Sequence, residues 1–216
     1  MANTEAQGTK MTALPLLNIP DSQEVVQFYS QSSKDTEPVT IADHSDWRRY
    51  ISNFHFVPNK DITYRGQEFP SIEHAFASVK YEYSTSNGDN AVPSFVTGSV
   101  LGNSANIKSE HSRAGMKKYR FAMDVAKFDQ DKEGIMRSLI TERARVDKPF
   151  HDILISIHSQ GYYLLHFARG GGGGWGGYQS KTDGKYYGEN MLGILLMEYA
   201  SDASQHQLEA GAGSRS

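Results

Sequence analysis

The segment SIEHAFASVKY, residues 71–81, sets the helical character of this chain. Its apolar side chains recur at i, i+4, i+7 and, just past the segment, i+11, which places four residues on one helix face: Ile72, Phe76, Val79 and Tyr83. Ser71 precedes the first of them, and serine is a preferred N-cap residue. The sequence therefore predicts a helix that begins after Ser71 and buries one face in a core.

The same segment carries an acid and an amine. Glu73 and Lys80 are seven residues apart, nearly two helical turns, so they share one stripe at about 10 Å along the axis. The small Ala77 lies between them at the rim of the buried face. This pairing suits a general acid or base and a nucleophilic lysine. On spacing alone, an ordinary helix flank that faces water is the favoured alternative.

The flanking sequence predicts further helices and a few short strands. The Arg65-Gly66 dipeptide separates two β-forming runs, as in a hairpin. The expected strands are 25–29, 62–64, 67–69 and 162–167, and the expected helices are centred on 112–128, 135–140, 150–157 and 189–200. We predict an α+β fold, a mainly helical single domain over 25–200. The polar, aperiodic ends are expected to be a flexible N-terminal segment, 1–24, and a flexible C-terminal tail, 201–216.

Composition excludes several function classes. The 216 residues include no cysteine, which removes disulfide frameworks, thiolate zinc sites and cysteine nucleophiles. The eight histidines show no metal-ligand spacing and no G-x-S-x-G motif occurs, so neither a metal site nor a serine hydrolase is expected. The sequence contains no apolar run of about 20 residues and no basic signal region. We expect an intracellular protein, cytoplasmic or nuclear, without cofactor, metal or membrane partner.

Charge is distributed unevenly. The net charge of -3 argues against a protein that coats nucleic acid by counterion release. Residues 108–148 nevertheless hold 11 Lys and Arg against 7 Asp and Glu. This stretch is either a solvated helical surface, the interpretation that we favour, or a face that contacts phosphates.

Glycines concentrate late in the chain, with eleven of the 20 between Gly161 and Gly193. The tract that includes Gly170–Gly177 fits neither a Walker loop nor the G-x-G-x-x-G of dinucleotide folds. A low-complexity linker is one interpretation. The other is that Trp175, held between glycines, forms a stacking platform for a ring or base.

Several short pieces, in order over about 25–200, resemble the NADAR family, the NAD- and ADP-ribose-associated domain with a riboflavin-pathway N-glycosidase-like fold. They are Phe28-Tyr29-Ser30, Ser52-Asn53-Phe54, Phe69-Pro70, Glu73-His74 with Lys80, Lys127-Phe128, Trp175-Gly176, and Gly188 to Gly193 with Leu196-Met197. The resemblance implies a compact, mostly helical N-glycosidase that cleaves a bond between ribose C1′ and a heterocycle nitrogen.

The resemblance also implies roles for individual residues. Lys80 is the family lysine thought to form a Schiff base with the opened ribose, and Glu73 is the family glutamate that would move protons. The implied substrate-binding residues are Tyr29, Ser52, Asn53, His74, Trp175, Gly176, Gly188 and Asn190. Asn53 and Asn190 would hold sugar or base edges, and Trp175 would stack on a ring.

Two departures from the family pattern guide the substrate prediction. Riboflavin-type members carry an Asp-Trp pair where this chain has Ser109–Ala114, and an aspartate where it has Gly172. We therefore favour ADP-ribosylated guanine, in nucleic acid or as a nucleotide, as the substrate and ADP-ribose as the product. The alternatives are an N-glycosidase for phosphoribosylated riboflavin-pathway pyrimidines and a non-catalytic module that binds ADP-ribose or NAD.

Overall fold

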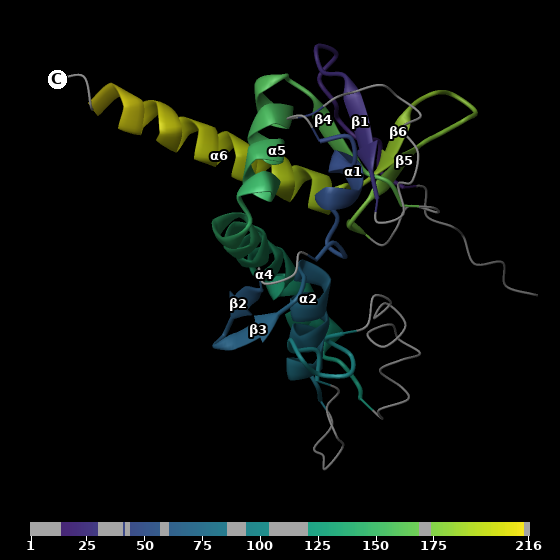
Figure 1. Cartoon of the computed structure of the whole chain (residues 1–216). Helices are drawn as coiled ribbons and strands as arrows, with labels where there is room; N and C mark the ends of the chain where they lie inside the picture. The colour runs from purple at the N-terminus through teal and green to yellow at the C-terminus, as the bar shows by residue number, and fades with distance from the viewer. Residues whose placement is uncertain are drawn as a thin grey trace, which may run out of the picture.

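The structure is a computed structural model that describes residues 14–29, 41, 44–56, 61–85, 94–103, 121–168 and 174–213. Its helices are α1 (Trp47–Tyr50), α2 (Ile72–Glu82), α4 (Val125–Val146), α5 (Lys148–Ser159) and α6 (Met191–Gly213). Its strands are β1 (Val25–Phe28), β2 (Ile62–Tyr64), β3 (Gln67–Phe69), β4 (Tyr163–His166), β5 (Gly177–Gln179) and β6 (Tyr186–Gly188). Helices make up most of the body in Figure 1, so the predicted α+β, mainly helical fold is confirmed.

The strands form three short pairs. β1 and β4 pair in parallel, and β5 and β6 pair antiparallel. β2 and β3 form the predicted hairpin, in which Arg65 and Gly66 both have positive φ angles, 49° and 77°, as a type I′ turn requires. An isolated bridge from Phe167 to Gly177 joins the end of β4 to the start of β5. This bridge connects the buried strand pair to the segment that follows the glycine tract.

Helix α2 forms where the sequence predicts it. The Ser71 hydroxyl accepts a hydrogen bond from the His74 amide at 3.4 Å, which confirms the N-cap. The predicted apolar face within the helix is at most 3% exposed: Ile72, Phe76 and Val79. Tyr83 lies one residue beyond the helix and is half-buried. These buried side chains fix which side of α2 faces the core. The flank with Glu73 and Lys80 therefore lies at the edge of the core, half-buried.

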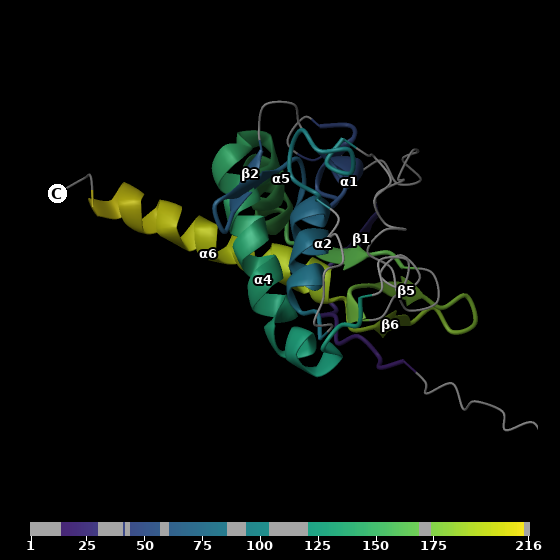
Figure 2. The ribbon, with the colours of Figure 1, turned by 90° about the horizontal axis from the view of Figure 1, so that it is seen from below.

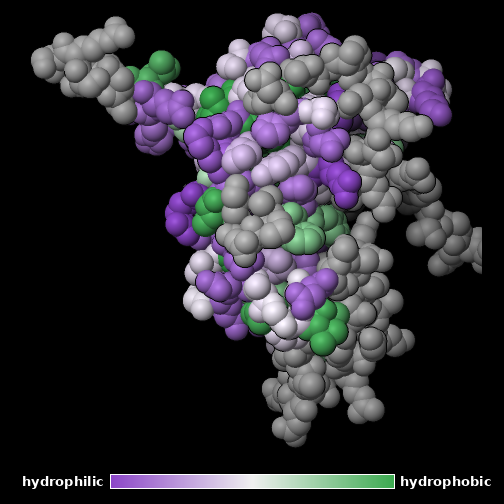
Figure 3. Space-filling view, in the orientation of Figure 1, coloured by the Kyte–Doolittle hydropathy of each residue, from purple (hydrophilic) through white to green (hydrophobic). Residues whose placement is uncertain are grey.

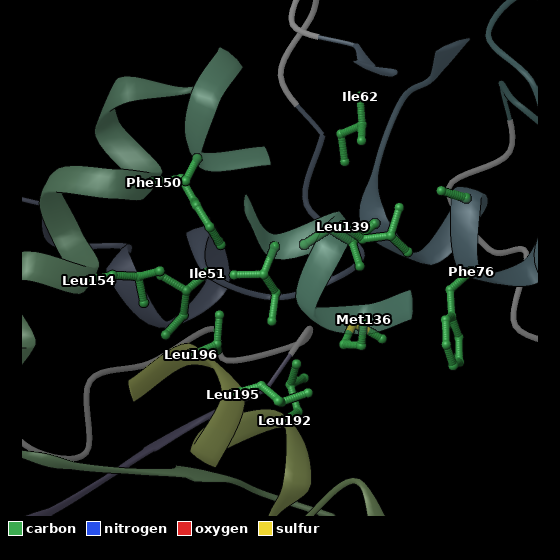
Figure 4. Packing of buried hydrophobic residues seen from close by; sticks show 14 of the residues in the cluster. Ile51, Ile62, Phe76, Met136, Leu139, Phe150, Leu154, Leu192, Leu195 and Leu196 are labelled. Carbon is green, nitrogen blue, oxygen red and sulfur yellow. The ribbon is translucent and has the colours of Figure 1, made fainter. Parts of the chain in front are cut away.

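The core lies where α4 contacts α2, α5 and α6. Figure 4 shows Met136 and Leu139 of α4 between Phe76 of α2 and the leucines of α6. Leu139 and Leu196 are fully buried. Burial of one such side chain contributes about 1.5–3 kcal/mol to the free energy of unfolding. The same helix contacts thus set the orientation of α2 relative to α6.

A buried ion pair ties the end of α4 to the start of α5. The Arg143 Nε and Nη2 atoms lie 2.9 and 2.7 Å from Asp147 Oδ2, and Nη1 donates to the His55 carbonyl at 2.7 Å. The Tyr50 hydroxyl donates to Asp147 Oδ1 at 2.9 Å. Burial and Asp147 together raise the pKa of Tyr50 to about 12, whereas burial and Arg143 lower the pKa of His55 to about 4.

Two predicted helix boundaries are wrong. The segments predicted around 112–128 and 135–140 share one helix, α4, which begins at Val125. The Asp124 carboxylate accepts from the Lys127 amide at 3.0 Å, and this cap sets the start. Residues 121–124 are not helical, and 112–120 lie outside the described residues. Gly134 stays within the helix despite the low helix propensity of glycine, because buried residues of α4 precede and follow it, among them Phe128 and Ile135.

The last helix extends well past its predicted end. α6 continues through Gly213, so 201–213, expected to be a tail, are helical. Figures 1 and 2 show this part of α6 projecting from the body. The Ser204 hydroxyl donates to the Ala200 carbonyl at 2.8 Å, and alanine, glutamine and glutamate in this stretch favour helix.

The surface seen in Figure 3 is mainly hydrophilic, with small separate hydrophobic patches. Among the residues that the structure describes, no helix combines the length and apolarity needed to cross a membrane.

Candidate active site

Lys80 lies in the last turns of α2, half-buried against an aromatic ring. Its Nζ is 5.0 Å from the centroid of the Phe76 ring, one helical turn earlier. Burial lowers the pKa of Lys80 below the usual lysine value, and the Glu73 carboxylate partly offsets this by raising it. A lowered pKa increases the fraction of neutral amine near neutral pH, which a nucleophilic lysine needs.

Glu73 lies in the first turn of α2 and is half-buried. Its amide donates to the Asn53 carbonyl at 2.9 Å, so one of the orphan amides at the helix start is satisfied by the loop that precedes β2. Its carboxylate raises the pKa of Lys80, against the larger effect of burial. Glu73 and Lys80 thus lie on the same helix and are both half-buried.

The Ser52-Asn53 segment packs between α2 and α4. The Asn53 amide nitrogen donates to the Met136 sulfur at 3.6 Å. Its Oδ1 is buried without a hydrogen-bond partner among the described residues, which leaves an acceptor inside the fold. The Ser52 hydroxyl accepts from the Phe54 amide at 3.2 Å and holds the turn. Asn53 is thus adjacent to Glu73, whereas the Ser52 hydroxyl hydrogen-bonds to the backbone of its own turn.

His74 is buried beneath the start of α2 at 4% exposure. Its ring Nδ1 lies 2.7 Å from the Ser71 hydroxyl oxygen. This contact orients the imidazole within the fold. Although His74 follows Glu73 in the sequence, its side chain lies on the buried side of the helix.

Trp175 packs directly on α2. Its half-buried indole meets the Phe76 ring edge-to-face, with centroids 5.3 Å apart. The Trp175 carbonyl accepts from the His166 ring at 3.0 Å, so His166 Nδ1 carries the proton. Because Lys80 and Trp175 both contact Phe76, the predicted amine and the predicted stacking platform converge on one ring.

Gly176, Gly188 and Asn190 form the turn that supports Trp175. A Cβ on Gly188, whose φ is 126°, would lie 2.5 Å from the Gly176 carbonyl oxygen, so the close approach requires glycine. Asn190 is fully buried, and its amide group donates to the Leu164 carbonyl at 2.8 Å and accepts from the His166 amide at 2.9 Å. These bonds make Asn190 a support of the turn, in place of the predicted contact with sugar or base.

Tyr29 lies at the end of β1. It is 39% exposed, and its ring is 5.7 Å from that of Phe167. Two other sequence features, 109–114 and Gly172, lie outside the described residues. Among the described residues there is also no group of three or more His, Asp or Glu side chains suited to a metal ion.

The described part of the basic stretch has acidic partners. Arg143 is buried, which withdraws it from any phosphate-binding face. Ion pairs join several other basic side chains of this stretch to carboxylates: Lys132 to Asp129, Arg137 to Glu198, Arg145 to Glu142, and Lys148 to Asp152. This pattern favours the solvated-surface interpretation for 121–148.

Three residues of the site were not singled out from the sequence. Phe76 reads as an ordinary core position, although its ring joins Lys80 to Trp175. His166 supports the Trp175 carbonyl, and the Glu189 carboxylate lies against Gly174. Glu189 lies within the piece Gly188 to Gly193 that resembles the family, so this motif could have pointed to it. The contacts of Phe76 depend on tertiary packing and had no such signal.

Comparisons with known proteins support the fold. No family model matches the chain, and no curated protein matches it. Among solved structures, the NMR structure of the E. coli protein YbiA is similar, with a TM-score of 0.50 and 17% sequence identity, over 87% of this chain and 89% of that one. At this identity the similarity shows a shared fold.

Proposed function

We propose that this chain is an N-glycosidase that hydrolyses the bond between ribose C1′ and guanine in ADP-ribosylated guanine. The observation that carries the proposal is the half-buried Lys80 amine, which has a lowered pKa and shares α2 with Glu73. The Trp175 ring, in contact with the same phenylalanine as Lys80, supplies an aromatic surface for a base. The YbiA-like fold is consistent with a glycosidase-type enzyme.

In the proposed reaction, the neutral Lys80 amine adds to ribose C1′. The C1′–N bond breaks with its electron pair on the guanine nitrogen, and Glu73 supplies the proton that restores the unmodified guanine. The amine then returns one proton to the Glu73 carboxylate and passes the other to ribose O4′ as the ring opens, which leaves an imine between Nζ and C1′. Addition of one water to the imine restores the lysine and releases ADP-ribose. The balance is one water consumed for one guanine and one ADP-ribose formed.

Side-by-side turnover tests this assignment. Purified protein is incubated with an ADP-ribosylated guanine oligonucleotide and, separately, with a ribosylaminopyrimidine phosphate, and the unmodified oligonucleotide and the released pyrimidine are quantified. We expect the unmodified oligonucleotide to form at a kcat/KM above that for the small phosphate. A large preference for the small phosphate would transfer the assignment to the riboflavin-type reaction. Tight binding of ADP-ribose with no product from either substrate would replace the enzyme by a binding module.

A further inference from the structure

Glu189 occupies a space that only a glycine leaves open. It lies between β6 and α6 and is exposed. A Cβ on Gly174, whose φ is +90°, would lie 2.7 Å from the Glu189 Oε2 atom. Any side chain at position 174 would therefore displace this carboxylate. The carboxylate thus lies against the residue that immediately precedes Trp175.

Backbone hydrogen bonds hold Glu189 and Trp175 together. The Leu192 amide donates to the Trp175 carbonyl at 3.2 Å, and the Asn190 amide donates to the Gly176 carbonyl at 3.2 Å. The residues on either side of these bonds are therefore fixed relative to each other. Because the bonds involve only main-chain atoms, the placement survives substitution of the Glu189 side chain.

The Glu189 carboxylate keeps its acceptor capacity. Within the part of the chain that the structure describes, no hydrogen bond or ion pair to this carboxylate is formed. An ionised carboxylate is acceptor-only, with two oxygens that can receive a pair of parallel N–H groups. It therefore favours a ligand edge with adjacent donors and repels one with an exposed acceptor.

The geometry points to Trp175 and Glu189 as a guanine-recognition pair, in which the indole stacks on the purine and the carboxylate accepts from N1–H and N2–H. Guanine alone among the common bases presents two adjacent donors on its Watson–Crick edge, whereas adenine and cytosine place a ring acceptor there. Enzymes that act on an unstacked base read it by such edge contacts together with stacking. Whichever of its nitrogens carries the ribose, guanine keeps a donor on that edge. The assignment rests on the proposed function for the identity of the substrate base.

Nucleotide binding tests the pair without any turnover. Binding of GMP, IMP and AMP is measured by quenching of tryptophan fluorescence and by calorimetry. The only other tryptophan, Trp47, is fully buried in the core, so quenching reports on Trp175. The variant Glu189→Gln keeps the size of the side chain but offers one acceptor only. Glu133→Gln, at an exposed position on α4, is the control with the same change in charge.

Base discrimination gives the deciding result. We expect GMP to bind the wild-type chain at least about tenfold more tightly than AMP, with IMP between them because it lacks the N2 amino group. Glu189→Gln should lose most of this preference and Glu133→Gln should keep it. Equal binding of GMP and AMP, no binding of either, or a preference that survives in Glu189→Gln would overturn the proposal.

A second variant separates this proposal from the reaction. Lys80→Met removes the amine that the proposed function requires and leaves Trp175 and Glu189 in place. It should therefore retain the GMP preference of the wild-type chain. A wild-type chain that prefers GMP but never restores unmodified guanine would contradict the proposed function alone. Turnover of ADP-ribosylated guanine by a chain without base preference would contradict the recognition pair alone.

Discussion

Arg143, which is buried, and Lys80, which is half-buried on α2, are cations in different surroundings. Arg143 is surrounded by oxygen acceptors, with two contacts to the Asp147 carboxylate and one to the His55 carbonyl. Lys80 instead has its amine above the Phe76 ring, and its burial lowers its pKa. A cation surrounded by acceptors stays charged and fixes structure, whereas a dehydrated amine releases its proton readily and gains nucleophilicity. The comparison favours a structural role for Arg143 and is consistent with the catalytic role that we propose for Lys80.

The largest expected effect is on activity, at Lys80. Lys80→Met should lower kcat/KM for ADP-ribosylated guanine by about a thousandfold or more, because the proposed nucleophile is absent. The free energy of unfolding should stay unchanged or rise, since a dehydrated charge is removed. Steady-state kinetics and urea unfolding measure the two quantities. Lys148→Met, at an exposed lysine, is the control and should change neither.

The reverse result is expected at Arg143. Arg143→Met should lower the free energy of unfolding by about 3–5 kcal/mol, because Asp147 is left buried without its cation. The fraction that remains folded should keep its turnover. Adding Asp147→Asn to this variant should recover part of the loss in urea unfolding. A stable Arg143→Met protein that has lost turnover would erase the distinction between the two cations.

The turn that carries Trp175 gives a smaller stability effect. Gly188→Ala should cost about 2–4 kcal/mol, since φ is 126° and the new Cβ would clash with the Gly176 carbonyl. Gly184→Ala is the matched control: its φ is also positive, 71°, but a Cβ there meets nothing within 4 Å. It should cost only about 1 kcal/mol. Equal losses in thermal unfolding would contradict the close packing beneath Trp175.

The smallest effect is a pH dependence of stability. The folded pKa of Lys80 lies below 10.5, the value of an unperturbed lysine. Between these two pKa values the unfolded chain binds more protons, so stability rises with pH in that window. Lys80→Met should remove this contribution, and Glu73→Gln should widen the window because the carboxylate raises the pKa of Lys80. Urea unfolding from pH 7 to 10 measures the slope, and an identical slope in all three proteins would contradict the lowered pKa.

Local signals in the sequence predicted the parts of the fold that depend on neighbouring residues. Ser71 with the apolar spacing of 72–83 predicted α2, and Arg65-Gly66 predicted the β2–β3 hairpin, because caps and turns are decided within a few residues. The start of α4 and the end of α6 were missed. Apolar spacing is clear in their core-facing parts, but the Asp124 cap sets the start of α4, and helix-favouring residues past Ala200 continue α6 beyond the core.

In the candidate site too, features set by local spacing were predicted and features set by tertiary contacts were missed. The pairing of Glu73 with Lys80 follows from helical spacing and was predicted. The contact of Phe76 with Trp175 joins residues about a hundred positions apart, and no local pattern encodes it. Arg143 and Asp147 belong to the stretch 108–148, for which we favoured a solvated surface, and only packing against Tyr50 and His55 shows that these two are buried. Asn190 fits a binding motif, but its amide serves the turn.

Reductive trapping tests the central claim most directly. The protein is mixed with an ADP-ribosylated guanine oligonucleotide in the presence of sodium borohydride, digested and analysed by mass spectrometry. If Lys80 forms the imine, one ADP-ribose is fixed covalently to the peptide that contains Lys80, and an equal amount of unmodified oligonucleotide is released. Release of unmodified oligonucleotide without an adduct, or an adduct on a different lysine, would contradict the account.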